Sequence, residues 1–151
     1  MRKAFAAVLL AAGLASGAPP AMAADAAQQE ANKKTVVEFY DKALNHKDFA
    51  AASAYFGPRY IQHNPDAADG IEGFHAFLNF LREKFPNSHS EIKKVFADGD
   101  YVILHVHAVR EPGTRGRAIV DIFRLENGKI VEHWDVRQDI PDKAANDNGM
   151  F

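Results

Sequence analysis

The spacing of hydrophobic residues changes near Pro86, and this change predicts two kinds of secondary structure. Before it, apolar residues recur every three or four positions in residues 26–45 and 70–85, as in amphipathic helices. A shorter helix is expected at residues 49–56, with Asp48 as its N-cap. After Pro86, apolar and polar residues tend to alternate, which predicts strands at residues 91–97, 101–110, 118–125 and 129–140.

Helices followed by strands predict an α+β domain. In this class, N-terminal helices pack on one face of a curved antiparallel sheet. The helices cannot seal the concave side of such a sheet completely. A cone-shaped pocket between helices and sheet is therefore the expected ligand site.

Residues 1–23 have the pattern of a signal peptide. Basic residues at positions 2 and 3 precede an apolar run at residues 4–14, and Ala21-Met22-Ala23 is a small-x-small cleavage site. The apolar run is too short to span a membrane. The mature chain is expected to begin at Ala24 or Asp25, and the protein to be periplasmic or secreted.

Composition and net charge restrict the kinds of molecule that the protein is expected to bind. There is no cysteine, so no disulfide supports the fold. The net charge is −2, and it becomes −4 when Arg2 and Lys3 are removed with residues 1–23. A mildly acidic chain without a basic run argues against nucleic acid as a partner.

The domain is expected to span residues 24–141, followed by a polar, disordered tail at residues 142–151.

Asp121 stands out because it lies in the middle of an apolar strand. A carboxylate there is paired, faces a cavity, or lies exposed on one strand face. If the preceding loop centres on Thr114, His107 lies opposite Asp121, and His105 shares their face. A shift of one residue would send Asp121 to the other face.

The Asn127-Gly128 hairpin leaves the next pairing open. A two-residue loop places Trp134 opposite Asp121, whereas a three-residue loop places His133 there, with Asp135 on the same face. The longer loop is favoured because it separates a polar face from an apolar face suited to a second subunit. The polar face would be Val131, His133, Asp135 and Arg137, and the apolar face Ile130, Trp134 and Val136.

Four motifs carry a resemblance to a known family. They are Tyr60-Ile-Gln-His-Asn-Pro65, Ala97-Asp-Gly-Asp-Tyr-Val102, Val120-Asp-Ile-Phe-Arg124 and Asn127-Gly-Lys-Ile-Val-Glu-His-Trp-Asp-Val136. With them the chain resembles SnoaL-like polyketide-cyclase-type proteins of the NTF2-like superfamily over residues 32–141. The resemblance implies a cone-shaped α+β barrel and a homodimer. It implies no metal or organic cofactor.

The resemblance also implies roles for single residues. Asp121 matches the strand carboxylate that is the acid/base of aldol cyclases, and that donates to the oxyanion in ketosteroid isomerases. Tyr40 matches the tyrosine of the first helix in those isomerases. Their general-base aspartate is replaced here by His63 or Asn64, which departs from isomerase chemistry. Export departs from the cyclases, which work beside cytoplasmic synthases.

The sequence therefore leads to two hypotheses about function. The first is a cofactor-free enzyme for proton transfer next to a carbonyl, an aldol-type cyclase or isomerase acting on a small hydrophobic substrate. Asp121 would be its acid and His63 or His107 its base, with substrate contacts from Tyr40, His105, His133, Trp134 and Asp135.

The second hypothesis is a non-catalytic, periplasmic small-molecule binding protein. Asp121 and His107 would then be only a structural pair, and His63 only a turn cap. Trp134 would then belong to packing or to a dimer interface.

Overall fold

The computed structural model describes residues 20–151, and side chains from Asp25 onward; the apolar run of the predicted signal peptide lies outside this part. The helices precede four of the five strands, which confirms the predicted α+β class. The elements are α1 (Pro20–Tyr40), a π-helical turn η1 (Asp41–Asn45), α2 (Phe49–Ser53), β1 (Phe56–Gln62), α3 (Gly70–Lys84), β2 (His89–Asp98), β3 (Tyr101–Val109), β4 (Arg117–Glu126) and β5 (Lys129–Asp139).

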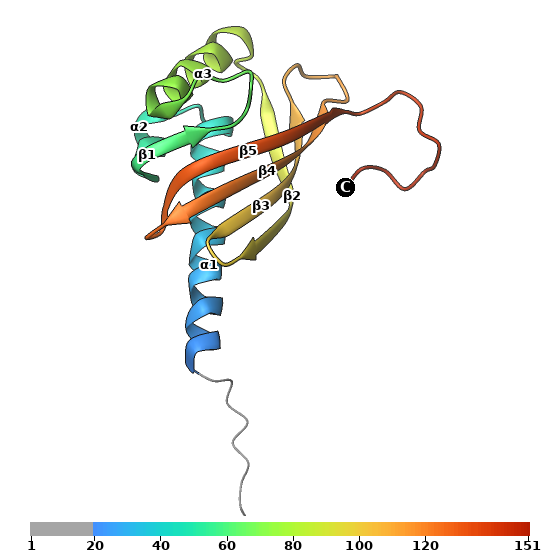
Figure 1. The fold of residues 1–151 in the computed structure, drawn as a ribbon. Coiled ribbons are helices and arrows are strands. Elements are labelled where there is room, and N and C mark those ends of the chain that lie inside the picture. Colours follow the sequence, from blue (N-terminus) through green and yellow to red (C-terminus); the bar gives the residue numbers. More distant parts are fainter. Residues whose placement is uncertain (1–19) are drawn as a thin grey trace, which may run out of the picture.

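The five strands form one curved sheet in the order β1-β5-β4-β3-β2. Strands β2 to β5 are antiparallel neighbours, whereas β1 runs parallel to β5 along one edge. The sheet is open and is not closed into a barrel. The helix α1 passes behind the sheet, and α3 lies beside β1 at its upper end (Figure 1). The hydrophobic core lies between these helices and the concave side of the sheet.

Four phenylalanines from four elements form the centre of that core. Phe39 at the end of α1 lies 5.2 Å from Phe56 of β1, 5.5 Å from Phe74 of α3 and 5.9 Å from Phe123 of β4, measured between ring centroids. All four rings are buried. This cluster fixes the end of α1, and with it Tyr40, over the concave face of β4.

Polar contacts hold the turn after α1 against β2. The Asn45 side chain donates to the Ser90 carbonyl at 3.1 Å and accepts from the Ser90 amide at 2.8 Å. Buried Lys47, whose φ is +53°, donates through Nζ to the Ser88 carbonyl at 3.0 Å. Burial lowers the pKa of Lys47. The helical segment is thus tied to the far edge of the sheet.

The connection from β3 to β4 corrects one expectation. It turns at Pro112-Gly113, where the Thr114 amide donates to the Glu111 carbonyl at 3.2 Å and Gly113 has a φ of +87°. Proline followed by a positive-φ glycine is the signature of a type II turn.

The loop therefore does not centre on Thr114, and the register moves by three residues. Asp121 pairs with Leu104, and His107 pairs with Ala118. Because the shift is odd, His105 and His107 face the opposite side of the sheet from Asp121.

The last hairpin combines features of both alternatives. Its loop is the two-residue Asn127-Gly128, with Glu126 paired to Lys129, so the favoured three-residue loop is wrong. A bulge at Val131 then shifts the register by one residue, and Asp135 faces Asp121. The polar face of His133, Asp135 and Arg137 still points inward. Ile130, expected on the outer face, is buried in the core instead.

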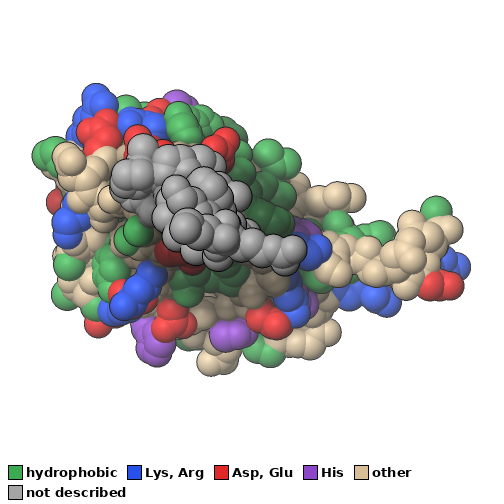
Figure 2. All heavy atoms as spheres, turned by 90° about the horizontal axis from the view of Figure 1, so that it is seen from below, with side chains coloured by type: hydrophobic (Ala, Val, Ile, Leu, Met, Phe, Trp, Pro, Cys, Tyr) green, Lys and Arg blue, Asp and Glu red, His purple; other side chains and the backbone are tan. Residues whose placement is uncertain are grey.

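The tail beyond β5 contains no helix or strand. Its last residue returns to the outer face of the sheet, where the Phe151 ring lies 5.2 Å from His105 and 4.9 Å from His107 between centroids. Disorder of this tail stays a prediction. Seen from below, Figure 2 shows charged side chains of both signs interspersed over the visible surface, with the tail extending to one side. Among the described helices, none is long and apolar enough to cross a membrane.

Gly116 offers a test of the β3–β4 register. Its φ is +73°, and a Cβ atom there would lie 2.3 Å from the Ala108 carbonyl oxygen. Gly113 also has a positive φ, but a Cβ atom there would contact nothing within 4 Å. In urea unfolding, Gly113→Ala should cost about 1–2 kcal/mol for the left-handed backbone alone. Gly116→Ala should cost clearly more, and equal losses would contradict this register.

Candidate active site

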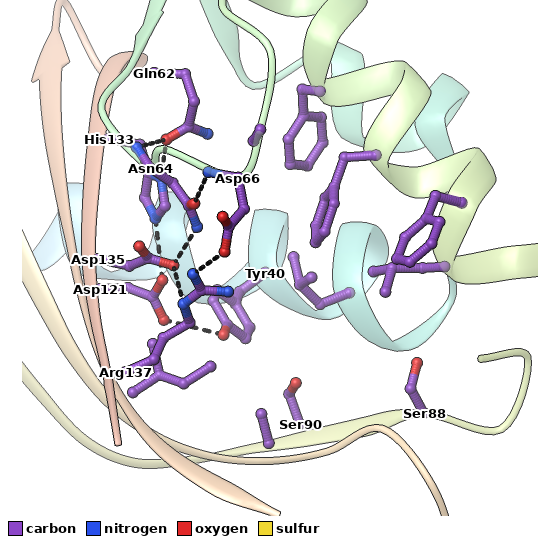
Figure 3. A pocket seen from close by; sticks show the side chains of 18 of the residues that line it. Tyr40, Gln62, Asn64, Asp66, Ser88, Ser90, Asp121, His133, Asp135 and Arg137 are labelled. Carbon is purple, nitrogen blue, oxygen red and sulfur yellow. Dashed lines mark hydrogen bonds and ion pairs between the residues drawn. The ribbon is translucent and has the colours of Figure 1, made fainter. Parts of the chain in front are cut away.

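A cavity of about 430 Å³ opens between the concave face of the sheet and the helices. This volume is in the range of small-molecule sites. Figure 3 shows its labelled polar side chains gathered mainly on the wall formed by β4, β5 and the segment after β1. The aromatic side chains of α3, including Phe74, Phe77 and Phe80, line it as well. The cavity is therefore apolar with one concentrated polar wall.

Asp121 is the buried centre of that wall. It is 4% exposed, and both its carboxylate oxygens have partners. Tyr40 donates its hydroxyl to Oδ2 at 3.0 Å, and His133 Nε2 lies 3.0 Å from Oδ1. Burial, and then the negative charge of Asp121, raise the pKa of Tyr40 well above its usual value, so Tyr40 remains a hydroxyl donor.

The hydrogen bonds around Gln62 decide which protons His133 carries. The Asn64 backbone amide, which can only donate, lies 2.9 Å from Gln62 Oε1. That atom is therefore the amide oxygen, and His133 Nδ1, also 2.9 Å from it, must be the donor. With Nδ1 protonated, the contact between His133 Nε2 and Asp121 Oδ1 needs a second proton. The pair is either imidazolium with carboxylate or imidazole with carboxylic acid.

A second carboxylate lies directly across the strands from the first. Asp135 pairs with Asp121 in the β4–β5 register, and its Oδ2 accepts from the Asn64 side-chain amide at 2.7 Å. The guanidinium of Arg137 approaches the same oxygen at 3.8 Å and also binds Asp66. The loop after β1 is thus joined to β5 across the polar wall (Figure 3).

The two other carboxylates of the polar wall, Asp135 and Asp66, have opposite electrostatic environments. Burial, together with the negative charge of Asp121, raises the pKa of Asp135, although His133 and Arg137 oppose this shift. The hydrogen bond and the charge of Arg137 lower the pKa of the exposed Asp66. Asp135 therefore holds its proton more tightly than Asp66, which stays ionised.

Four residues proposed for the site lie outside the cavity. His63 stacks on Trp134 with ring centroids 4.6 Å apart, and its Nε2 lies 2.9 Å from Glu132 Oε1. His107 Nε2 lies 2.8 Å from the Arg115 carbonyl, and His105 is beside the C-terminal ring. His63, His105, His107 and Trp134 belong to the outer side of the sheet, so the base and contact roles expected of them are not retained. Within residues 20–151, no group of three or more His, Cys, Asp or Glu side chains is arranged to hold a metal ion.

Of the other proposed residues, Tyr40, Asp121, His133 and Asp135 all line the cavity. The sequence reasoning missed Tyr60, Gln62 and Asp66 as lining residues. Their signal was present, because Tyr60, Gln62 and Asn64 alternate along β1 and its extension.

Residues 36–133 match the family model described as the SnoaL-like domain. The chain belongs to the SnoaL-like domain family. The match spans the end of α1 through His133, and therefore includes Tyr40 and Asp121. A comparison with curated proteins gave no significant match.

Solved structures of the SnoaL-like type share the fold. A protein from Acidithiobacillus ferrooxidans, provisionally named a polyketide cyclase, is 20% identical over 71% of this chain and 87% of its own, with a TM-score of 0.61. A provisionally named SnoaL-like polyketide cyclase from Jannaschia sp. CCS1 is 23% identical over 72% and 86%, with a TM-score of 0.59. AclR from Streptomyces galilaeus, provisionally named a hydroxylase, is 21% identical over 73% and 90%, with a TM-score of 0.61. At this identity the similarity shows the fold of a SnoaL-like protein and no particular reaction.

The raised pKa of Asp135 gives a prediction for stability against pH. The folded protein holds this proton more tightly than the unfolded chain does. The contribution of Asp135 to the free energy of unfolding should therefore fall as pH rises above the ordinary aspartate pKa of about 3.9. Asp135→Asn removes this loss, so the variant should equal or exceed the wild type in stability at pH 7. That advantage should disappear below about pH 4.

Urea unfolding at several pH values measures this difference. Gln138→Asn, at an exposed position of the same strand that does not titrate, is the control and should keep the wild-type pH dependence. A wild type that gains stability over Asp135→Asn as pH rises would contradict the raised pKa.

Proposed function

We propose that this SnoaL-like protein is a cofactor-free enzyme that transfers a proton next to a carbonyl group of a small hydrophobic substrate, as an aldol-type cyclase or isomerase does. The observation that carries the proposal is the buried Asp121, bound by Tyr40 and His133 on the polar wall of an otherwise apolar cavity. Such a wall provides a positioned acid/base in a water-poor environment, as enolisation requires.

The proposed chemistry follows from which groups of the polar wall carry protons. In the imidazolium–carboxylate form, Asp121 accepts the proton on the carbon next to the carbonyl, and the electron pair moves to the carbonyl oxygen. Arg137 and Asn64 are donors on the same wall that suit the resulting enolate. The proton then returns from Asp121 to carbon or oxygen. Gln62 and Tyr40 are positioning residues, because they act on His133 and Asp121 rather than on the substrate.

One observation favours the alternative of a binding protein without catalysis. Both oxygens of Asp121 are already bound by protein groups, and none of the fully buried side-chain polar atoms among the described residues lacks a partner. A satisfied network of this kind also suits a rigid ligand pocket. The two proposals differ in whether Asp121 exchanges protons with a bound carbonyl compound.

Deuterium incorporation separates them. The enolisable ketone 2-tetralone is incubated with the protein in D2O, and loss of its α-proton signal is followed by NMR. The enzyme hypothesis expects exchange above the buffer rate. Asp121→Asn keeps the size of the side chain and removes its basicity, so it should lower the protein-dependent rate about 10²–10⁴-fold. Tyr40→Phe should give a smaller loss, because it removes one donor to Asp121.

The control is Asp98→Asn, which lies at the exposed β2–β3 turn away from the cavity and should exchange like the wild type. Thermal unfolding of each variant separates lost chemistry from lost folding. A wild type that protects itself against unfolding by binding the ketone, yet gives no exchange above buffer, would overturn the enzyme proposal and support the binding protein.

We further propose that the protein is exported, which is supported only by the pattern of residues 1–23. Cleavage after Ala23 would leave a chain in which α1 starts at or just before Asp25, and an acidic residue at a helix start suits the helix dipole. Intact-mass measurement of protein from its native host should show a start at Ala24 or Asp25. Cytoplasmic material still carrying Met1 would contradict export.

We also propose a homodimer formed through the outer face of the sheet. Val136 is 70% exposed and Phe96 is 54% exposed on that face, where Tyr101 and Val120 are exposed too. Apolar side chains gathered in this way are typical of a partner surface. Light scattering across micromolar concentrations tests this state, and a constant monomer mass would exclude it.

A further inference from the structure

Three arginines gather at one end of the cavity. On the concave face, Arg137 of β5 pairs with Ile119 of β4, Arg117 of β4 pairs with Ala108 of β3, and Arg110 directly follows β3. Arg110, Arg117 and Arg137 all line the cavity. Arg117 is four residues from Asp121 along β4, a separation of about 13 Å in an extended strand. Arg117, and Arg110 beyond the end of β3, therefore lie at a distance from the proposed reacting group, whereas Arg137 lies between them and Asp121.

The carboxylates near these arginines do not cover all of their charge. Arg137 binds Asp66, and Arg117 lies 3.2 Å from Asp139, whose side chain is 82% exposed. Among the described residues, Arg110 has no carboxylate within ion-pair distance; its guanidinium lies 5.3 Å from the centroid of the Phe85 ring. The arginine end thus keeps positive charge that no ion pair among the described residues neutralises.

The environment of Arg110 agrees with this picture. Burial, and then the positive charges of Arg117 and Arg137, lower the pKa of Arg110. An unpaired guanidinium beside two others costs stability unless an anion joins it. A guanidinium group suits an oxyanion, because its planar donors bind two oxygens at once.

The wall beside the arginines is apolar. Phe77, Phe80 and Leu81 of α3 line the cavity, and the Phe80 ring lies 5.6 Å from the ring of Phe85, which is beside Arg110. A ligand that fills this space has an apolar body and one charged group at its end. The cavity thus has a reacting end, an apolar side along α3 and a positively charged end.

We propose that the ligand of this cavity is an amphipathic anion, whose apolar body lies along α3 and whose terminal carboxylate or phosphate is bound by Arg110 and Arg117. This proposal deepens the proposed function by giving its substrate class. Its test uses binding, so it does not depend on turnover.

Calorimetric titration at pH 7 compares four compounds: octanoate, octyl phosphate, the neutral 1-octanol, and inorganic phosphate. Either amphipathic anion should bind more tightly than both octanol and inorganic phosphate. The tighter of the two identifies the anionic group. Arg110→Met keeps an unbranched apolar side chain and removes the charge. It should weaken binding of the anion about 10- to 100-fold, as expected for a charged hydrogen bond, and leave octanol unchanged.

Arg59→Met is the matched control. Arg59 lies on β1, where it pairs with Glu126 at 3.5 Å, and it lines neither the cavity nor the adjoining pocket that Arg110 and Arg117 share. It should keep the wild-type affinity. Equal affinity for octanol and octanoate would overturn the proposal, as would inorganic phosphate binding as tightly as the octyl anions. An equal effect of the two arginine variants would also overturn it.

The same titrations with Asp121→Asn separate this inference from the proposed function. The preference for an anion should persist in that variant, because Asp121 lies away from the arginine end. Absence of ketone exchange in the wild type, together with an anion preference that depends on Arg110, would reject the enzyme and retain the ligand class. Circular dichroism melts of each variant confirm that it is folded.

Discussion

The buried carboxylate of Asp121 is the constraint on which the rest of the site depends. An isolated ionised carboxylate in an apolar strand is strongly unfavourable, so it requires donors at close range. Those donors come from elements far apart in the sequence, Tyr40 at the end of α1 and His133 on β5. The aromatic cluster around Phe39 and the contacts of Asn45 with β2 hold α1 where its tyrosine can reach. The packing of the helices therefore determines which donors reach Asp121, and with them the protonation of the site.

Much of the fold follows from the hydrophobic pattern, because helices and strands differ in the spacing of their buried residues. The α+β class and the order of the three helices and of strands β2 to β5 follow from that spacing, whereas β1 was not among the predicted strands. It was harder to predict which side chains of each strand point inward, because this depends on where the preceding loop turns. Pro112-Gly113 held the needed information, and reading Thr114 as the centre moved His105 and His107 to the wrong side. Gln62 escaped notice for a different reason, because its role lies in a hydrogen bond to His133 across 71 positions.

The concave surface divides its charges by position. Acidic groups and their hydrogen-bond partners lie at one end, around Asp121 and Asp135, and the arginines lie at the other. Arg137 stands between them and contacts both Asp135 and Asp66. This arrangement gives the cavity a direction along the strands, so that a ligand with one polar end has a preferred orientation. The apolar residues of α3 contribute affinity without selecting that orientation.

Because of the bulge at Val131, the composition of the cavity depends on the length of β5 at that point. The two-residue turn alone would direct Trp134 inward, and the single additional residue directs His133, Asp135 and Arg137 inward instead. A deletion at this point would exchange the complete set of inward and outward side chains along the distal half of β5. A substitution there would exchange none of them. In this fold, a one-residue change in length can therefore replace an entire polar wall in one step, whereas point mutations must alter it residue by residue.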